Sequence, residues 1–181
     1  MTKWKVDNSW TLFLDRDGVI NTRLENDYVK SPQEFQFIHG SDDAIVSLSR
    51  IFGWIFVVTN QQGIGKGLMT ESNLNEIHRL MEQKIEIKGG SITKVYYAPG
   101  ISSPNNYMRK PKPGMALLAQ RQHKGVDFGK SIMVGDTDSD IIFGVKLGMK
   151  TVRIISEIET VKVEADITIG SLTELQKYLE L

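Results

Sequence analysis

The sequence contains no cysteine, only three histidines, and no excess of either charge. The absence of cysteine excludes disulfides, thiol nucleophiles and cysteine-ligated zinc or iron–sulfur sites. It is compatible with a reducing cytosol. Lysine and arginine together number 22, and so do aspartate and glutamate. No overall positive field therefore favours nucleic acid or an anionic membrane surface, and we do not expect nucleic acid as a partner.

Long apolar segments are also missing. The N-terminal stretch lacks the apolar region of a signal peptide, and no uninterrupted apolar run approaches the length of a membrane span. Of the 181 residues, 40% are hydrophobic and 24% are charged, which is typical of a soluble globular protein. We therefore expect a single monomeric domain over residues 1–181, located in the cytoplasm and not bound to a membrane.

Short apolar runs alternate with amphipathic segments, a pattern typical of an α/β domain with a mostly parallel sheet. With right-handed crossovers, this order predicts a doubly wound sheet between two helical layers. The predicted strands are 11–14, 54–59, 92–98, 131–135, 151–155 and 167–169. The predicted helices begin at Ser41 and at Thr70, end near Gln122 and at Leu147, and close the chain over Ser171–Leu181.

One stretch organises the rest: the apolar run Leu12–Leu14 leads directly into Asp15 and Asp17, with Gly18 beside them. Leaving the sheet edge in a tight turn, the two carboxylates can converge on one point. Two close carboxylates repel each other unless a cation lies between them. A hard cation with oxygen ligands, Mg²⁺, is the expected occupant. The alternative is an Asp-rich turn without a ligand.

Other polar residues follow apolar runs at the same expected edge. Asp15, Thr59 and Asp136 each end a predicted strand. In a doubly wound sheet, ligands bind beyond the carboxyl ends of the strands, where strand order reverses. Asp136 and its neighbours could instead be capping residues, and Asp138 is best interpreted as the acid that opens the next helix. The predicted metal ligands are Asp15, Asp17, Asp136 and, as a further candidate, Asp140.

Phosphoryl transfer needs this set of groups. A phosphate ester repels an attacking carboxylate, so a metal, a fixed cation and hydrogen-bond donors must surround it. Asp15 is the candidate nucleophile, and Asp17 is the candidate general acid and base. Thr59 and Asn60 offer donors to the phosphate, and Lys110 supplies the fixed cation.

Alternatives remain for several of these residues. Thr59 could simply end a strand, Lys112 is a rival to Lys110, and Arg109 could be a surface residue. The glycine-bearing loop 63–67 resembles a phosphate cradle, but it lacks Walker A or dinucleotide spacing. We assign no chemistry to the histidines, and His78 is expected to be exposed or a packing residue on its helix.

Four motifs in order resemble those of the haloacid dehalogenase superfamily of phosphatases. They are Asp15–Val19, Val58–Asn60, Lys110 and Gly135–Asp140. The resemblance covers residues 11–155, most of the chain. It implies a Rossmann-like core and Mg²⁺-dependent hydrolysis of phosphate monoesters through an aspartyl-phosphate.

A closer resemblance is to the branch acting on heptose bisphosphates and histidinol phosphate. It implies that Arg109 contacts substrate beside Lys110 and that Thr59, Asn60 and Gln61 line the phosphate site. The expected substrate is a phosphorylated sugar, best the 7-phosphate of D-glycero-D-manno-heptose 1,7-bisphosphate. Histidinol phosphate, a polynucleotide 3′-phosphate and a catalytically silent binding domain are the alternatives. The segments that carry this closer resemblance are Asp15–Asn21, Asp27–Val29, Phe35–Ile38, Thr59–Ile64 and Arg109–Met115.

One segment departs from that branch, whose members commonly carry a Cys/His zinc loop before the Arg-Lys-Pro segment. The corresponding residues 98–108 contain neither cysteine nor histidine, so we expect no zinc. Packing of Ile101, Tyr107 or Met108 is expected to order this loop instead. The intervals between the motifs leave no room for a large cap domain. We therefore predict an open site shielded by short flaps at about 21–40 and 99–110.

Overall fold

The computed structural model describes residues 3–155 and 161–181. Six of its strands form one fully parallel sheet in the order β4-β3-β2-β5-β6-β7, and two more pair with each other. Each strand of the large sheet matches a predicted one to within two residues. The strands are β1 (Trp4–Lys5), β2 (Thr11–Leu14), β3 (Trp54–Asn60), β4 (Lys94–Ala98), β5 (Ser131–Gly135), β6 (Lys150–Ile154), β7 (Ile167–Ile169) and β8 (Leu179–Glu180).

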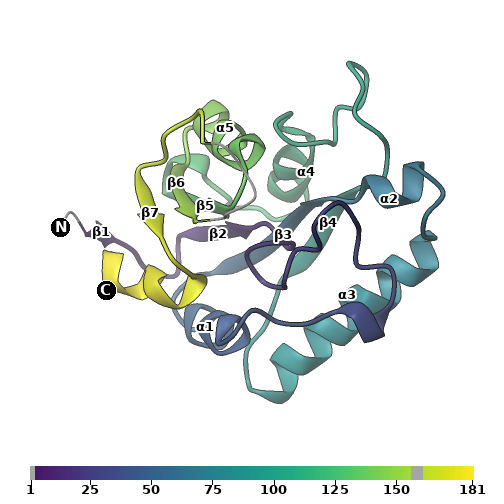
Figure 1. Cartoon of the computed structure of the whole chain (residues 1–181). Coiled ribbons are helices and arrows are strands. Elements are labelled where there is room, and N and C mark those ends of the chain that lie inside the picture. The colour runs from purple at the N-terminus through teal and green to yellow at the C-terminus, as the bar shows by residue number, and fades with distance from the viewer. Residues whose placement is uncertain (1–2, 156–160) are drawn as a thin grey trace.

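Helices cover both faces of this sheet. α1 and α3 lie on one side, and α4 and α5 lie on the other (Figure 1). The three-layer doubly wound fold predicted from the alternation of strands and helices is therefore confirmed, without a large cap. The helices are α1 (Ser41–Leu48), α2 (Gln62–Gly65), α3 (Glu71–Ile87), α4 (Gly114–Gln122) and α5 (Asp138–Leu147), with 3₁₀ turns η1 (Pro32–Glu34), η2 (Phe128–Lys130) and η3 (Leu172–Tyr178).

The sheet divides the hydrophobic core in two because successive side chains of a strand point to opposite faces. In β2, Leu12 and Leu14 belong to the cluster under α1 and α3, whereas Phe13 belongs to the cluster under α4 and α5. All three are fully buried. Parallel strands covered on both faces are expected to be continuous apolar runs, as β2, β3 and β5 are.

Sequence signals set the ends of α3 and α5. Thr70 and Asn73 form a reciprocal capping box at the start of α3. Thr137 and Asp140 form the same device at the start of α5, which ends at Gly148 in a left-handed conformation with φ of 75°. The start of α5 matters most, because it fixes the orientation of Asp140.

Two predictions about local structure were wrong. Ser41 is not a helix cap: Gly40 takes that position with φ of 75°, and the Ser41 hydroxyl donates to the Ile20 carbonyl at 2.6 Å. The closing segment is not an α-helix over 171–181. It is the 3₁₀ turn η3 followed by β8, which pairs with β1. Leucines spaced three apart fit a 3₁₀ turn as well as an α-helix.

The first flap, residues 21–40, packs onto the domain through its aromatic residues. Phe35 is buried, and its ring meets that of Phe37 edge-on with centroids 5.0 Å apart. Tyr28 packs against the same core from the pocket side.

The second flap is ordered differently from part of our expectation. Ile101 and Tyr107 are exposed by 53% and 56%, so neither anchors the loop; only Met108 packs against the core. The loop is instead closed by Lys112, whose ammonium donates to the carbonyls of Ser103, at 2.8 Å, and of Pro104. The second flap, predicted at about 99–110, is therefore held in place by the hydrogen bonds of Lys112.

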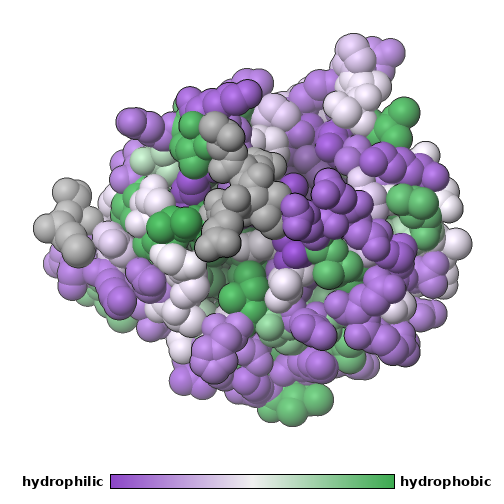
Figure 2. Space-filling model, in the orientation of Figure 1, coloured by the Kyte–Doolittle hydropathy of each residue, from purple (hydrophilic) through white to green (hydrophobic). Residues whose placement is uncertain are grey.

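The surface is mainly hydrophilic on the face drawn in Figure 2, with hydrophobic residues in small scattered groups. Such scattered apolar residues are normal for a protein surface. Within the described ranges, no helix is long and apolar enough to cross a membrane.

Candidate active site

The site lies where the strand order reverses. β2 pairs with β3 on one side and with β5 on the other, so the carboxyl ends of these three strands form one edge. The backbone N–H of Asp15 continues the ladder by donating to the Val134 carbonyl at 2.9 Å. Asp15, Thr59 and Asp136 are therefore brought together, as predicted for ligand groups in a doubly wound sheet.

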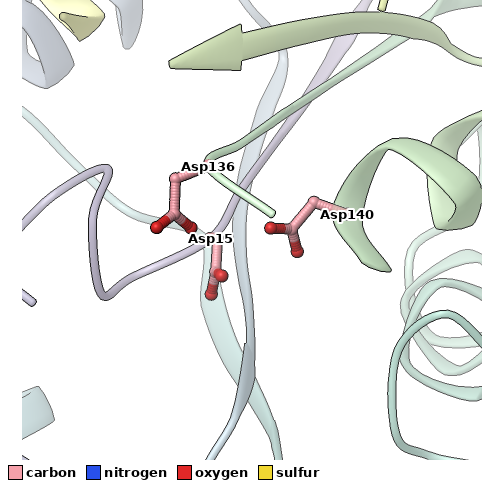
Figure 3. A group of neighbouring side chains, drawn as sticks. All are labelled: Asp15, Asp136 and Asp140. Carbon is pink, nitrogen blue, oxygen red and sulfur yellow. The ribbon is translucent and has the colours of Figure 1, made fainter. Parts of the chain in front are cut away.

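Three carboxylates converge at this edge. Asp15 follows β2, Asp136 follows β5, and Asp140 projects from the first turn of α5 (Figure 3). One oxygen atom from each carboxylate lies within 4.8 Å of those from the other two, and the side chains are exposed by no more than 12%. Asp140, a secondary candidate from the sequence, belongs to the cluster as closely as the other two.

A single buried lysine lies against the cluster. The Lys110 ammonium is 2.9 Å from Asp15 Oδ1 and 2.6 Å from Asp140 Oδ1. Burial alone would lower the pKa of Lys110, but the charges of Asp140 and Asp15 outweigh burial and raise it. The structure thus brings the charge of Lys110, the predicted fixed cation, into contact with two of the three carboxylates. Its rival, Lys112, is occupied by the second flap.

The cluster holds more negative charge than Lys110 can balance. Burial and the neighbouring Asp140 raise the pKa of Asp15 to about 8, despite the opposing charge of Lys110. Burial and Asp140 also raise the pKa of Asp136 to about 6, although Arg23 opposes this rise through a contact of 3.0 Å. Both shifts indicate that the three carboxylates favour an additional cation.

The residues fit a hard divalent metal ion. Asp136 Oδ1 is buried and lacks a hydrogen-bond donor among the described residues, so an acceptor is left over. The backbone approaches closely here. A Cβ at Gly18 would lie 2.3 Å from Asp136 Oδ2, and φ of 88° at this position also favours glycine. Carboxylate oxygens are the ligands that Mg²⁺ prefers.

Asp17 does not join this cluster with its carboxylate. Both of its oxygens accept from the guanidinium of Arg16 at 2.9 Å; Oδ1 also accepts from Asn21 at 2.9 Å, and Oδ2 from Gln61 at 2.8 Å. Burial alone would raise the pKa of Asp17, but the Arg16 charge and these hydrogen bonds outweigh burial and lower it. The expected convergence of the Asp15 and Asp17 carboxylates is therefore wrong, although Asp17 still lines the pocket.

Sequence reasoning missed Arg16 and Arg23, and it left His78 as either an exposed or a packing residue. Arg16 is fully buried, and His78 is buried as well, which agrees with the second of these alternatives. An arginine placed directly between two acids after a buried strand was a usable signal. Arg23, in the first flap, offered none.

Thr59, Asn60 and Gln61 surround the expected phosphate position in different ways. Thr59 lines the pocket, and its Oγ1 accepts from Gln61 at 2.9 Å, which leaves its own hydrogen free to donate. The Asn60 side chain exchanges hydrogen bonds with the backbone of Lys110, at 3.0 and 3.2 Å, and so holds that segment in place. Gln61 is fully buried behind the pocket wall and contacts Asp17 and Thr59 instead of solvent. The expectation that Gln61 lines the site is therefore corrected.

A cavity of about 500 Å³ opens beside the carboxylates. Its wall includes three basic residues, Arg23, Lys66 and Arg109, whereas Lys110 is buried. One guanidinium nitrogen of Arg109 is buried and has no hydrogen-bond partner among the described residues, and burial lowers the Arg109 pKa. Lys66 donates to the hydroxyl of Tyr28 at 3.0 Å.

This arrangement defines a phosphatase of the haloacid dehalogenase (HAD) type. Three carboxylates and a buried lysine lie together at the switch point of a parallel sheet, and metal-assisted phosphoryl transfer requires groups of these kinds.

The comparisons with known proteins agree with this class. The HAD-hydrolase-like family profile matches residues 107–175. The D-glycero-alpha-D-manno-heptose-1,7-bisphosphate 7-phosphatase of Mycobacterium bovis is 38% identical over 78% of this chain and 74% of its own length. The D-glycero-beta-D-manno-heptose-1,7-bisphosphate 7-phosphatase of Vibrio cholerae is 33% identical over 93% and 95%.

A solved structure is similar over nearly the whole chain. The D,D-heptose 1,7-bisphosphate phosphatase of B. bronchiseptica, crystallised with magnesium and phosphate, has a TM-score of 0.84 and 27% identity, and the match covers 93% of this chain and 96% of that one. The chain therefore belongs to the HAD superfamily of phosphatases, in the branch of the heptose bisphosphate phosphatases.

Proposed function

We propose that the protein removes the 7-phosphate from a D-glycero-D-manno-heptose 1,7-bisphosphate. The observation that carries this proposal is the presence of basic residues at two separate positions around the pocket. Lys110 lies at the carboxylate cluster, where the reacting phosphate must sit, while Arg109 and Lys66 lie on the wall of the same cavity. A substrate with two phosphates uses both positions, and the relatives carry heptose bisphosphate in their names.

In the first step, an Asp15 oxygen attacks the phosphorus, and the bond between phosphorus and the sugar oxygen breaks. The leaving oxygen takes a proton from the Asp17 carboxyl, which must be protonated when substrate binds although Arg16 lowers its pKa in this structure, and the phosphoryl group becomes an aspartyl-phosphate. Lys110 and the Thr59 hydroxyl are placed to stabilise the equatorial oxygens. Asn60 holds the Lys110 backbone during this step.

In the second step, water attacks the aspartyl-phosphate, Asp17 accepts the water proton, and Asp15 is released with inorganic phosphate. The lowered pKa of Asp17 in the structure suits the base of this second step. Asp15, Asp136 and Asp140 would hold Mg²⁺, and we add the backbone carbonyl of Asp17 as a further candidate ligand. When bound, the ion supplies charge neutralisation for the attacking carboxylate and the phosphate.

Phosphate release from a defined set of substrates tests the proposal. We expect Mg²⁺-dependent release from the heptose 1,7-bisphosphate, and the alpha and beta anomers must be assayed separately because the relatives include both. Histidinol phosphate and a 3′-phosphorylated oligonucleotide are the competing substrates. Faster turnover of either compound would identify it, in place of the heptose bisphosphate, as the substrate. If the wild type releases no phosphate from any of these substrates, and Asp15→Asn causes no loss, the result would favour a catalytically silent binding domain.

Replacement of Asp17 by asparagine tests the proton transfer. We expect Asp17→Asn to lower kcat by roughly a hundredfold or more while Mg²⁺ binding is retained, because the variant keeps the backbone but cannot exchange a proton. Calorimetric titration with Mg²⁺ and steady-state kinetics measure the two effects separately. Unchanged turnover would remove Asp17 from the mechanism.

The second-phosphate position has its own test. Arg109→Ala should lower kcat/KM for the bisphosphate by ~10- to 100-fold, as expected from a charge-assisted hydrogen bond of ~1.5–3 kcal/mol. Activity on heptose 7-phosphate should change much less. Equal losses on both substrates would place Arg109 at the reacting phosphate instead.

Several expectations stay predictions beside this proposal. They are a single domain over residues 1–181 with two short flaps, a monomeric state, a cytoplasmic location, and the absence of zinc, membrane and nucleic-acid partners.

A further inference from the structure

A fully buried arginine lies next to the nucleophile. Arg16 is 0% exposed, and one of its terminal nitrogens donates to both oxygens of Asp17 at 2.9 Å. Its other terminal nitrogen lies 3.2 Å from Nε2 of His78, which belongs to α3. A chain of three side chains thus leads from the pocket to the helix that covers the sheet.

His78 is the acceptor in this chain. Burial, reinforced by the positive charge of Arg16, lowers the pKa of His78 to about 3, so its ring is neutral. An arginine can only donate, and Nε2 therefore carries no hydrogen. The ring is held from the side by Tyr97 in β4, with centroids 5.9 Å apart.

This geometry confines the guanidinium of Arg16. The planar group donates in fixed directions, so an acceptor on one side and a carboxylate on the other determine where it lies. Asp17 gains its orientation from the same group, together with single hydrogen bonds from Asn21 and Gln61. Among the described residues, only Arg16 donates to both oxygens of Asp17, and the Arg16 side chain has His78 as its partner outside residues 15–17.

We propose that His78 is a positioning residue for the reaction. His78 fixes the side chain of Arg16, and Arg16 in turn holds the Asp17 carboxylate where it exchanges protons with the substrate oxygen and with water. His78 itself touches neither substrate nor metal ligands. This inference rests on the proposed role of Asp17, and it makes α3 part of the catalytic apparatus.

The test compares two substitutions of His78. His78→Leu keeps most of the bulk but removes the acceptor, whereas His78→Gln retains an acceptor near the position of Nε2. We expect His78→Leu to lower kcat on the order of tenfold to a hundredfold, the range associated with a misplaced catalytic group, with KM changed less than about twofold. His78→Gln should restore most of kcat.

A matched control separates positioning from packing. Ile85→Val removes one methyl group from the same buried face of α3, without a polar contact. It should lower the melting temperature without lowering kcat. A His78→Leu variant that is folded, melts within a few degrees of Ile85→Val and retains the wild-type kcat would overturn the proposal. Equal kcat losses in His78→Leu and His78→Gln would overturn it as well.

Asp17→Asn distinguishes failure of this inference from failure of the proposed mechanism. If Asp17→Asn is fully active, the proton-transfer role is wrong and His78 has nothing to position. If Asp17→Asn is inactive while His78→Leu is fully active, only the present inference fails. Because Arg16 variants leave Asp17 uncompensated and are prone to misfolding, the His78 pair gives the decisive measurement.

Discussion

Asp15→Asn should stabilise the metal-free protein while abolishing its turnover. Asp15 is buried in a cluster of three carboxylates that has one ammonium, and neutralising one member relieves their repulsion. Lys110 keeps a partner in the variant, because Asp140 lies 2.6 Å from its nitrogen. Residues of an active site commonly reduce stability for the sake of function.

The size of this effect follows from the pKa of Asp15, which burial and Asp140 raise from 3.8 to about 8. Below about pH 4 the carboxyl is protonated in both the folded and unfolded states and contributes nothing. Between about pH 4 and 8 the folded chain retains a proton that the unfolded chain releases, so stability falls by up to ~1.4 kcal/mol per pH unit. At pH 7 the upper limit of this loss in the free energy of unfolding is about 4 kcal/mol.

The lost contact with Lys110 offsets part of that gain, and we expect about 2 kcal/mol. For a domain of this length, this corresponds to a rise in the melting temperature of roughly 4–8 °C. Thermal unfolding of the two proteins in chelator, between pH 5 and pH 8, measures the effect, and the difference should grow with pH. Mg²⁺ should raise the melting temperature of the wild type more than that of the variant.

Asp138→Asn is the matched control for this prediction. Asp138 lies two residues beyond Asp136, but its carboxylate accepts from Arg153 at 2.6 Å and from the backbone of Lys162 and Val163. The same substitution there should lower the melting temperature. A metal-free Asp15→Asn protein less stable than the wild type, or a difference that shrinks as pH rises, would refute the electrostatic reasoning.

Three other substitutions test separate features. Lys112→Met removes the hydrogen bonds that hold the second flap and should raise KM with little change in kcat; wild-type KM would mean that the flap does not shape the pocket. Arg23→Gln should tighten Mg²⁺ binding about fivefold in calorimetric titration, because Arg23 forms a partly exposed ion pair of ~1 kcal/mol with Asp136, and weaker binding would contradict this. Gly18→Ala should remove both Mg²⁺ binding and activity, since its Cβ would overlap the Asp136 carboxylate, and a functional variant would show that this turn can shift.

The large-scale fold could be predicted from the sequence because the ends of the strands are marked by a change from apolar to polar residues. Asp15, Thr59 and Asp136 each follow a continuous apolar run, and parallel strands must place such residues on one edge. Lys110 was predictable for a different reason, namely its position in a recognised motif. Its packing between Asp15 and Asp140 was not.

What the sequence could not supply was the direction of individual side chains. Asp17 and Asp15 are separated by one residue, yet one carboxylate faces the metal cluster and the other faces Arg16. His78 occupies a helical position that fits an exposed residue or a packing residue equally well, and only the tertiary structure gives it a polar partner. Gln61 was misplaced for the same reason.

The seam between β2 and β5 joins two parts of the chain that are distant in sequence. Asp15, Thr59 and Lys110 precede α4, whereas Asp136 and Asp140 follow it. A chain divided between α4 and β5 would therefore carry the nucleophile and lysine on one fragment and two metal-binding carboxylates on the other. Neither fragment should bind Mg²⁺ tightly or release phosphate alone. Restored phosphatase activity on mixing would report that the fragments had paired again between β2 and β5. The division would then give an assay of fragment complementation.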